Sequence, residues 1–384
     1  MSQLEHAASE PDLEQVELQE QDEESSEPLD LAADERRLVT QPYDFSVSSL
    51  IEDIDSGRLL LELEYQRSYV WDDAKASRLI ESLLLNVPIP VCYFAENEDG
   101  SLEVVDGQQR LKSIWRFATG RDDADRLELR GLPVLTELNG KTFAQISNRD
   151  QRRLLNRTIR CIVITEDSHP DIKFDVFERL NTGAVRLTDQ ELRNSIYRGL
   201  LNDALKEAAR FEPFQRLLSG QLATRMGDVE LVLRFIALAD RLGGYRPPLR
   251  QFLNEYMREH RTDVEAVEGL FDSFRQTSET TEEVFGTDAF RRFTLGDSAG
   301  RQINKALFDA TMISFYLADQ DMIRARSGEV RNAFRDLLGD SSFEALIGRA
   351  TADRARMFGR IRSFSRSIEA LGIETRYEAV VPSE

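Results

Sequence analysis

Apolar residues are spaced for both helices and strands in the first half of the chain. In WDDAKASRLIESLLLN, residues 71–86, they recur every three or four positions and predict a helix with one buried stripe. VCYFA and LEVVD, residues 91–95 and 102–106, predict two buried strands joined as a β-hairpin by the loop ENEDGS. Before them, the pattern predicts a helix over 47–57 and an extended segment over 61–71.

Mixed elements continue to about residue 200, after which the pattern is helical. The helix expected after the hairpin ends at Gly120. RCIVIT, residues 160–165, predicts another strand, and TDQE, residues 188–191, predicts a capping box at a helix start. The sequence therefore predicts an α+β domain over residues 38–200, followed by an all-helical domain over residues 201–384.

Composition adds an acidic amino-terminal segment to this picture. Residues 1–37 carry 13 acidic and 2 basic side chains, so they hold more than half of the chain's net charge of -20. They also lack aromatic residues and a sustained apolar period, so they cannot bury enough surface to offset the entropy lost on ordering. We therefore expect residues 1–37 to form a disordered acidic tail.

The chain has no pattern typical of a membrane or secreted protein. It contains no run of eighteen apolar residues, and its start lacks the basic and apolar regions of a signal peptide. Cys92 and Cys161 lie inside apolar runs without a CxxC spacing, which predicts buried free thiols without a part in the mechanism. We expect a cytoplasmic protein without a membrane partner.

The stretch DGQQR, residues 106–110, lies where a predicted strand passes into a predicted helix. If Asp106 caps that helix, the backbone N–H groups of residues 107–109 have no partner within the helix and carry partial positive charge. A helix start of this kind is an anion site. Because Gly107 has no side chain, a phosphate could approach the backbone closely.

Neighbouring side chains add further groups to this candidate anion site. Arg110 can fold back over the helix start and bind phosphate through two parallel hydrogen bonds, while Gln108 and Gln109 offer neutral donors. A helix end contributes about 0.3 to 1 kcal/mol and a hydrogen bond to a charged group about 1.5 to 3 kcal/mol. Micromolar binding needs about 8 kcal/mol, so other groups must converge. Arg67 in YQRSYVW and Asn181 in RLNTG are the residues expected to do so.

Asp106 has three interpretations. It could serve only as the helix cap, hold Mg²⁺ through water, or orient a water molecule that attacks a phosphate. The whole stretch could also be a plain connection between strand and helix with a solvated arginine, because DGQQR is not an established phosphate loop.

Four motifs in one order extend this interpretation: YQRSYVW, LIESLLLNVPIP, VVDGQQRLKSI and FERLNTGAVRLTDQELRN. Over residues 43–200 the chain resembles the amino-terminal domain of GmrSD-type modification-dependent restriction enzymes. The resemblance implies a ParB/sulfiredoxin-like α+β fold in which DGQQR handles a nucleoside triphosphate. Mg²⁺ would accompany the nucleotide if Asp106 holds the ion through water. By this resemblance Asp106 and Arg110 are the expected catalytic residues. The expected nucleotide-binding residues are Gly107, Gln108, Gln109, Arg110, Arg67 and Asn181. No metal ligand is assigned. Glu191 also matches the family, but the capping box explains it.

One part of the family pattern is missing. Full-length GmrSD-type enzymes resemble a fusion or pair with an HNH nuclease, whose chemistry needs a histidine base beside further metal ligands. This chain has three histidines, His6, His169 and His260, which are far apart in the sequence. The nuclease half is therefore expected to be absent. Cleavage, if it occurs, is expected from a separate partner, and a nuclease or methyltransferase subunit is the partner considered.

Three functions follow from these observations. The first is a module that binds, and by expectation hydrolyses, a nucleoside triphosphate as sensor or regulator in a restriction or phage-defence system. The second is a DNA-binding protein without NTPase activity, which would use arginine-rich stretches such as RRLLNRTIR, residues 152–160; in a continuous helix these arginines would point to several sides. The third is a nuclease in its own right, although no compact carboxylate cluster supports two metals.

Overall fold

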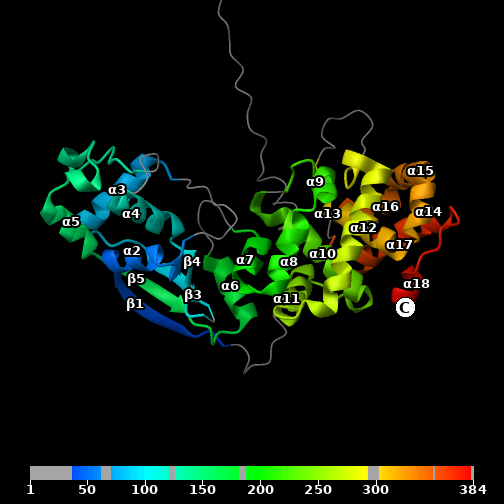
Figure 1. Ribbon diagram of the computed structural model, residues 1–384, viewed down its shortest axis with the longest axis horizontal. Helices are drawn as coiled ribbons and strands as arrows, with labels where there is room; N and C mark the ends of the chain where they lie inside the picture. Colours follow the sequence, from blue (N-terminus) through cyan, green and yellow to red (C-terminus); the bar gives the residue numbers. More distant parts are fainter. Residues whose placement is uncertain are drawn as a thin grey trace, which may run out of the picture. The chain divides into compact units, whose positions relative to one another are not determined.

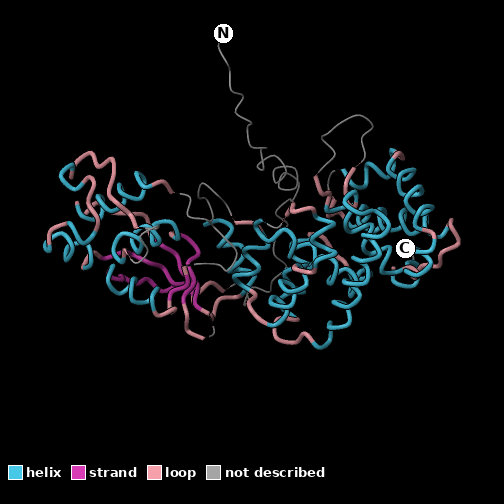
Figure 2. Tube along the Cα trace, turned by 45° about the horizontal axis from the view of Figure 1, so that its top comes forward, coloured by secondary structure: helices cyan, strands magenta, loops and turns pink. Residues whose placement is uncertain are grey.

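The computed structural model describes residues 37–61, 71–97, 99–120, 126–180, 187–222, 224–292, 302–348 and 351–381. They fall into two compact units that divide between Tyr197 and Arg198. Figures 1 and 2 show strands in the first unit and helices in both. The predicted acidic tail lies outside the described residues, except for Arg37. The predicted domain ranges, and the nucleotide-binding role given to residues 38–200, stay predictions.

The first unit is built on a mixed sheet of five strands in the order β1-β5-β3-β4-β2. β3 and β4 form the predicted antiparallel hairpin, while β3 and β5 run parallel, with Cys92 opposite Cys161. β1 pairs antiparallel with β5 at one edge, and β2 pairs parallel with β4 at the other. The strands are β1 Thr40–Ser46, β2 Leu59–Leu60, β3 Cys92–Glu96, β4 Leu102–Asp106 and β5 Thr158–Ile164.

Helices α2 to α5 cover one face of this sheet (Figure 1). Side-chain caps fix two of their starts: Ser46 accepts from the N–H of Ser49 before α2, and Asp72 accepts from that of Lys75 before α3. The apolar stripe predicted for α3 is buried. Of the extended segment predicted over 61–71, only the two end residues are described. The helices of the unit are α2 Val47–Asp55, α3 Asp73–Leu84, α4 Gln108–Thr119, α5 Asn148–Leu155, α6 Pro170–Leu180 and α7 Asp189–Ile196.

Glu81 of α3 holds the long connection between α4 and α5. Its Oε1 atom accepts hydrogen bonds from the N–H groups of Val134 at 2.9 Å and Leu135 at 2.7 Å. The carboxylate is buried, so these two bonds replace the water that it loses. Glu81 thereby fixes the connection that leads to α5, which packs against α3 and α2.

The second unit consists of packed helices, and no strand occurs among its described residues beyond one isolated bridge, between Ala318 and Thr375. At its centre α10, α13 and α17 each contribute one charged residue, Arg234, Asp309 and Arg360. The predicted fold class, α+β followed by helices, is confirmed; its likeness to ParB and sulfiredoxin stays an expectation. The helices are α8 Leu200–Ala209, α9 Glu212–Leu218, α10 Gly227–Arg241, α11 Leu249–Glu259, α12 Glu268–Phe285, α13 Lys305–Leu317, α14 Gln320–Ala325, α15 Ser327–Leu338, α16 Ser341–Gly348, α17 Arg354–Glu369 and α18 Tyr377–Val380.

Candidate functional site

The DGQQR stretch connects β4 to α4, as its position in the sequence predicted. Asp106 is the last residue of β4, Gly107 occupies the N-cap position, and α4 begins at Gln108. The prediction that Asp106 caps the helix is wrong. Gly107 adopts a left-handed conformation with φ of 106° and Asp106 stays in the strand, so the residue at the N-cap position offers α4 no side-chain cap. An α-helix leaves its first N–H groups without partners inside the helix, so the start of α4 keeps its partial positive charge.

Arg110 does fold back toward this helix start, as predicted. Its Nη2 atom donates to Oδ2 of Asp106 at 2.6 Å, and Nη1 donates to the carbonyl oxygens of Pro90 and Val91, the latter at 3.3 Å. Arg110 is 8% exposed, whereas the side chain of Asp106 is 39% exposed. The guanidinium therefore links segments of the protein and is also a candidate group for binding a ligand. Because a guanidinium has five N–H donors, these three bonds leave at most two for a ligand.

Cys92 explains why position 107 is a glycine. A Cβ atom added to Gly107 would lie 2.6 Å from Sγ of Cys92, and the positive φ would strain any side chain there. The glycine thus makes room for a thiol of the neighbouring strand. We predicted that it would make room for a phosphate, and the structure supplies a sufficient packing reason instead.

The same thiol belongs to a buried pair. Cys92 and Cys161 are both fully buried free thiols at paired positions of β3 and β5, which confirms that part of the prediction. The pKa of Cys92 is lowered, because it accepts a hydrogen bond from Cys161 and lies near the charge of Arg110, although burial opposes this. The pKa of Cys161 is raised, since its proton serves that hydrogen bond and the site is buried. Cys92 was expected to have no bearing on the site, yet it lies directly against Gly107.

Gln108 and Gln109 bind the chain's own backbone. Nε2 of Gln108 donates to the carbonyl oxygen of Leu61, and Oε1 of Gln109 accepts from the N–H of Trp71 at 3.4 Å. We predicted both side chains as donors to a ligand, but in the structure they hold the two residues that flank 62–70. Their amide groups are therefore used, at least in part, to attach Leu61 and Trp71 to α4.

Two other predicted site residues, Arg67 and Asn181, lie outside the described residues. The predicted capping box at the start of α7 is confirmed. The N–H of Thr188 donates to Oε2 of Glu191 at 2.7 Å, and the N–H of Glu191 donates to Oγ1 of Thr188 at 3.2 Å. Glu191 thus has the structural role that the sequence predicted for it.

Sequence analysis missed the groups that anchor Arg110. Its backbone acceptors, Pro90 and Val91, lie some twenty residues before it in the sequence. Local patterns cannot reveal which carbonyl groups a distant arginine meets. No group of three or more His, Cys, Asp or Glu residues that could hold a metal ion occurs in the described part of the chain.

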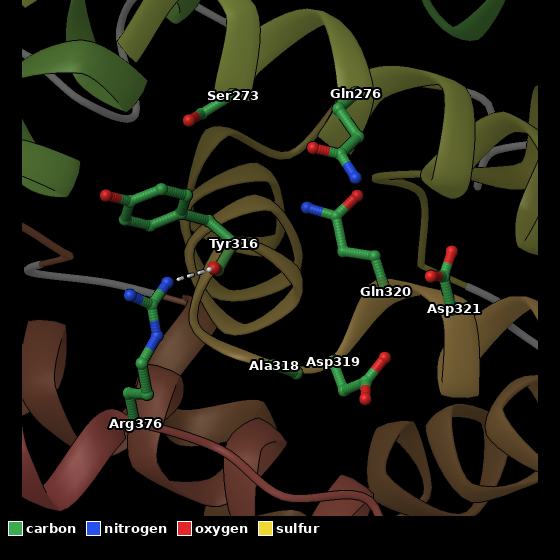
Figure 3. Close-up of a pocket in the computed structure, with 8 residues that line it drawn as sticks. All are labelled: Ser273, Gln276, Tyr316, Ala318, Asp319, Gln320, Asp321 and Arg376. Atoms are coloured by element: carbon green, nitrogen blue, oxygen red, sulfur yellow. Dashed lines mark hydrogen bonds between the residues drawn. The ribbon is translucent and has the colours of Figure 1, made fainter. Parts of the chain in front are cut away.

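A small pocket lies in the second unit (Figure 3). It measures about 210 Å³ and is lined by polar groups from α12, the start of α14 and the segment before α18. Arg376 donates to the carbonyl oxygen of Tyr316 at 3.1 Å, and Gln320 is held by Thr277 and Thr280 at 3.0 and 2.8 Å. The pocket is smaller than the 300 to 1,000 Å³ typical of ligand sites. Its polar groups are already used between helices, so we assign no ligand to it.

The part of the chain that contains this site matches a known protein family. Residues 47–198, which contain α2 to α7 and the whole DGQQR junction, match the family model described as "GmrSD restriction endonuclease, N-terminal domain". No curated protein matches the chain. Within the described residues, every helix is too short or too polar to cross a membrane.

Proposed function

We propose that residues 47–198, a GmrSD restriction endonuclease N-terminal domain, bind and hydrolyse a nucleoside triphosphate and so regulate a restriction or phage-defence system. The family supports the setting. The nucleotide, its hydrolysis and the residues involved are our proposal. Any cleavage of DNA would then fall to a separate nuclease, and a methyltransferase subunit is the other partner proposed.

The observation that carries the proposal is the start of α4, where Gly107 supplies no side-chain cap, with the guanidinium of Arg110 bonded to Asp106 beside it. An uncapped helix start attracts anions, and Arg110 retains up to two N–H donors beside it. Bonds to protein hold the guanidinium in place, so a ligand would not have to order it. Arg67 and Asn181 remain the sequence-based candidates for the further contacts that micromolar binding requires.

Asp106 is the proposed residue for hydrolysis. Oδ2 is taken up by Arg110, while the side chain is 39% exposed, so the carboxylate can reach solvent beside the helix start. A carboxylate there fits Mg²⁺, which proteins bind through one or two carboxylates together with phosphate oxygens and water. It also fits the alternative role of orienting an attacking water.

Arg110→Gln compared with Arg116→Gln tests the site. Both arginines lie on α4, both are 8% exposed and both pair with an aspartate. Their structural cost is therefore similar, but only Arg110 lies at the helix start. With a panel of ATP, GTP, CTP and UTP plus Mg²⁺, the wild-type chain should show a thermal shift with at least one nucleotide. Arg110→Gln should weaken that binding at least tenfold, and Arg116→Gln should leave it within about twofold.

Folding must be followed in the same samples, because Arg110 also holds the backbone at Pro90 and Val91. The only two tryptophans, Trp71 and Trp115, both lie in the first unit, so tryptophan fluorescence reports its unfolding. Equal loss of nucleotide binding in both variants would assign Arg110 a purely structural role. Absence of binding by the wild-type chain to all four nucleotides would remove the proposal.

A further inference from the structure

One segment of the first unit is basic although the chain is strongly acidic. Residues 126–160 carry eight basic and three acidic side chains, a net charge of +5, within a chain of net charge -20. This segment contains the connection held by Glu81, helix α5 and the start of β5. Its basic residues are arginines except for Lys141.

Three of these arginines form one surface, which we name the α5 arginine face: Arg149, Arg152 and Arg153. Their spacing of three and four positions places them on the same side of α5, and all three are exposed. Leu154 faces the other way and is fully buried in the core. We expected the arginines of residues 152–160 to point to several sides, as in one continuous helix. The helix in fact ends at Leu155, and Arg152 and Arg153 each lie about one helical turn from Arg149.

The α5 arginine face lacks carboxylate partners. Among the described residues, no Asp or Glu lies within ion-pair distance of its three guanidinium groups, and the one hydrogen bond they form runs from Nε of Arg152 to the carbonyl oxygen of Asn148, at 3.2 Å. Asp150, on the same helix, is bound to the hydroxyl of Ser147 at 2.6 Å.

Three other exposed arginines of the same unit are paired. Arg58, Arg160 and Arg179 have side chains that are 61%, 56% and 76% exposed. Each lies within 3.5 Å of an aspartate, respectively Asp53, Asp44 and Asp175. The α5 arginine face therefore differs from these three paired arginines in having three positive charges left for an external partner.

We propose that the α5 arginine face binds the phosphate backbone of duplex DNA. Guanidinium groups match phosphate oxygens through paired hydrogen bonds. The exposed residues beside them, Ser147, Asn148 and Asn156, are polar residues of the kind that contact phosphates. An interface for an acidic protein would be expected to have an apolar or aromatic centre, which this helix face does not offer. The proposal does not depend on nucleotide binding at α4.

The test compares three full-length chains in binding to a fluorescently labelled duplex of random sequence. They are the wild type, the face variant Arg149→Gln/Arg152→Gln/Arg153→Gln, and the control variant Arg58→Gln/Arg160→Gln/Arg179→Gln. Both variants lose three positive charges, but the control loses only paired ones. Fluorescence anisotropy is measured between 50 and about 200 mM salt, since each phosphate contact contributes about 0.9 to the slope of log affinity against log salt.

The wild type should bind, with affinity falling as salt rises. The face variant should bind at least tenfold more weakly at the lowest salt. The slope of its log affinity against log salt should be smaller in magnitude by about 2 to 3, since each of the three lost phosphate contacts contributes about 0.9. The control variant should stay within about threefold of the wild type. Tryptophan fluorescence should show that both variants remain folded.

Three results would overturn the proposal. One is a wild type that shows no salt-dependent binding. Another is an equal loss of affinity in both variants, which would reduce the effect to net charge. The third is displacement of the duplex by polyglutamate as effectively, per charge, as by unlabelled DNA. That result would assign the surface to an acidic protein instead.

Discussion

Each unit contains a cluster of arginine and aspartate, and the two clusters lie in opposite surroundings. In the second unit, Asp309 and Arg360 are fully buried and Arg234 has a side chain that is 5% exposed. Asp309 accepts from Nε and Nη2 of Arg234 at 3.0 and 2.7 Å and from Nη2 of Arg360 at 2.7 Å. In the first unit, the Asp106 carboxylate accepts from Arg110 and still reaches solvent.

This difference in burial indicates which cluster can take part in ligand binding or catalysis. The buried cluster joins three helices, and burial lowers the pKa of Arg360 while the charge of Asp309 opposes this. Removing its carboxylate would leave two buried positive charges with one partner fewer. At the DGQQR junction, backbone carbonyl groups share the guanidinium of Arg110 with Asp106, and the Asp106 carboxylate reaches solvent. The buried cluster of the second unit is thus a structural element, whereas the Asp106–Arg110 pair of the first unit is a place where a ligand could act.

Asp309→Asn should have the largest effect on stability. It leaves Arg234 and Arg360 buried without their shared negative charge, which typically costs about 3 to 5 kcal/mol. The urea concentration at the midpoint of unfolding, followed by far-UV circular dichroism, should fall strongly. The midpoint followed by tryptophan fluorescence, which reports the first unit, should stay the same. Asp272→Asn is the control, because Asp272 is 77% exposed and its pair with Arg275 contributes about 0 to 1 kcal/mol. Similar shifts in both variants would contradict the structural role of the buried cluster.

Gly107→Ala should come next, at about 1 to 3 kcal/mol for a side chain forced to a positive φ. The added methyl group also meets Sγ of Cys92. The midpoint of unfolding by tryptophan fluorescence measures the loss. Combining it with Cys92→Ala should recover part of the loss, because the contact disappears while the strained φ remains. No recovery in the double variant would show that Cys92 is not the reason for the glycine.

Asp106→Asn should change the stability of the first unit by about 1 kcal/mol or less, since the carboxylate is well exposed and its pair is screened by water. The same substitution that is severe at position 309 should therefore be mild here, and a direct comparison of the two variants measures the contrast. Under the proposed function, Asp106→Asn should lower nucleotide hydrolysis without weakening binding, because it removes a negative charge beside the phosphates. A loss of several kcal/mol would place Asp106 among the structural residues.

Glu282→Gln should have the smallest effect, and it should depend on pH. The pKa of Glu282 is lowered, chiefly because Arg216 donates hydrogen bonds to it, against a small opposing effect of burial. A lowered pKa stabilises the folded state at pH values above the unfolded pKa, and this contribution is lost as pH falls through the folded value. The difference in Tm between wild type and variant should therefore be present at pH 7 and shrink as the pH falls below the unfolded pKa of a glutamate, about 4.3. A difference that persisted in acid would refute the ion pair as its source.

Local elements could be predicted from the sequence, because short-range signals determine them. The apolar stripe of α3, the hairpin of β3 and β4, and the Thr188 capping box all depend on residues a few positions apart. The order of the sheet could not be predicted, since β5 lies between β1 and β3 through contacts that span many residues.

The position of the candidate site could be predicted from the sequence, but the hydrogen-bond partners of its side chains could not. DGQQR lies at a helix start with Arg110 folded back, as its sequence indicated. Asp106 is displaced from the cap by Gly107, whose conformation depends on Cys92 one strand away. The two glutamines bind Leu61 and Trp71, partners that no spacing rule identifies. These differences come from packing between distant segments, which a single sequence does not display.

The position of β1 in the sheet has a consequence for synthesis of the protein. Its described partner strand is β5, and the nearest pair in their register, Ser46 with Thr158, is separated by more than a hundred residues. At ribosomal speeds of about 5 to 20 residues per second, the newly made β1 waits on the order of ten seconds for that partner. During this interval its backbone hydrogen-bonding groups are exposed to other nascent chains, so this strand is where cotranslational protection by a chaperone would matter most.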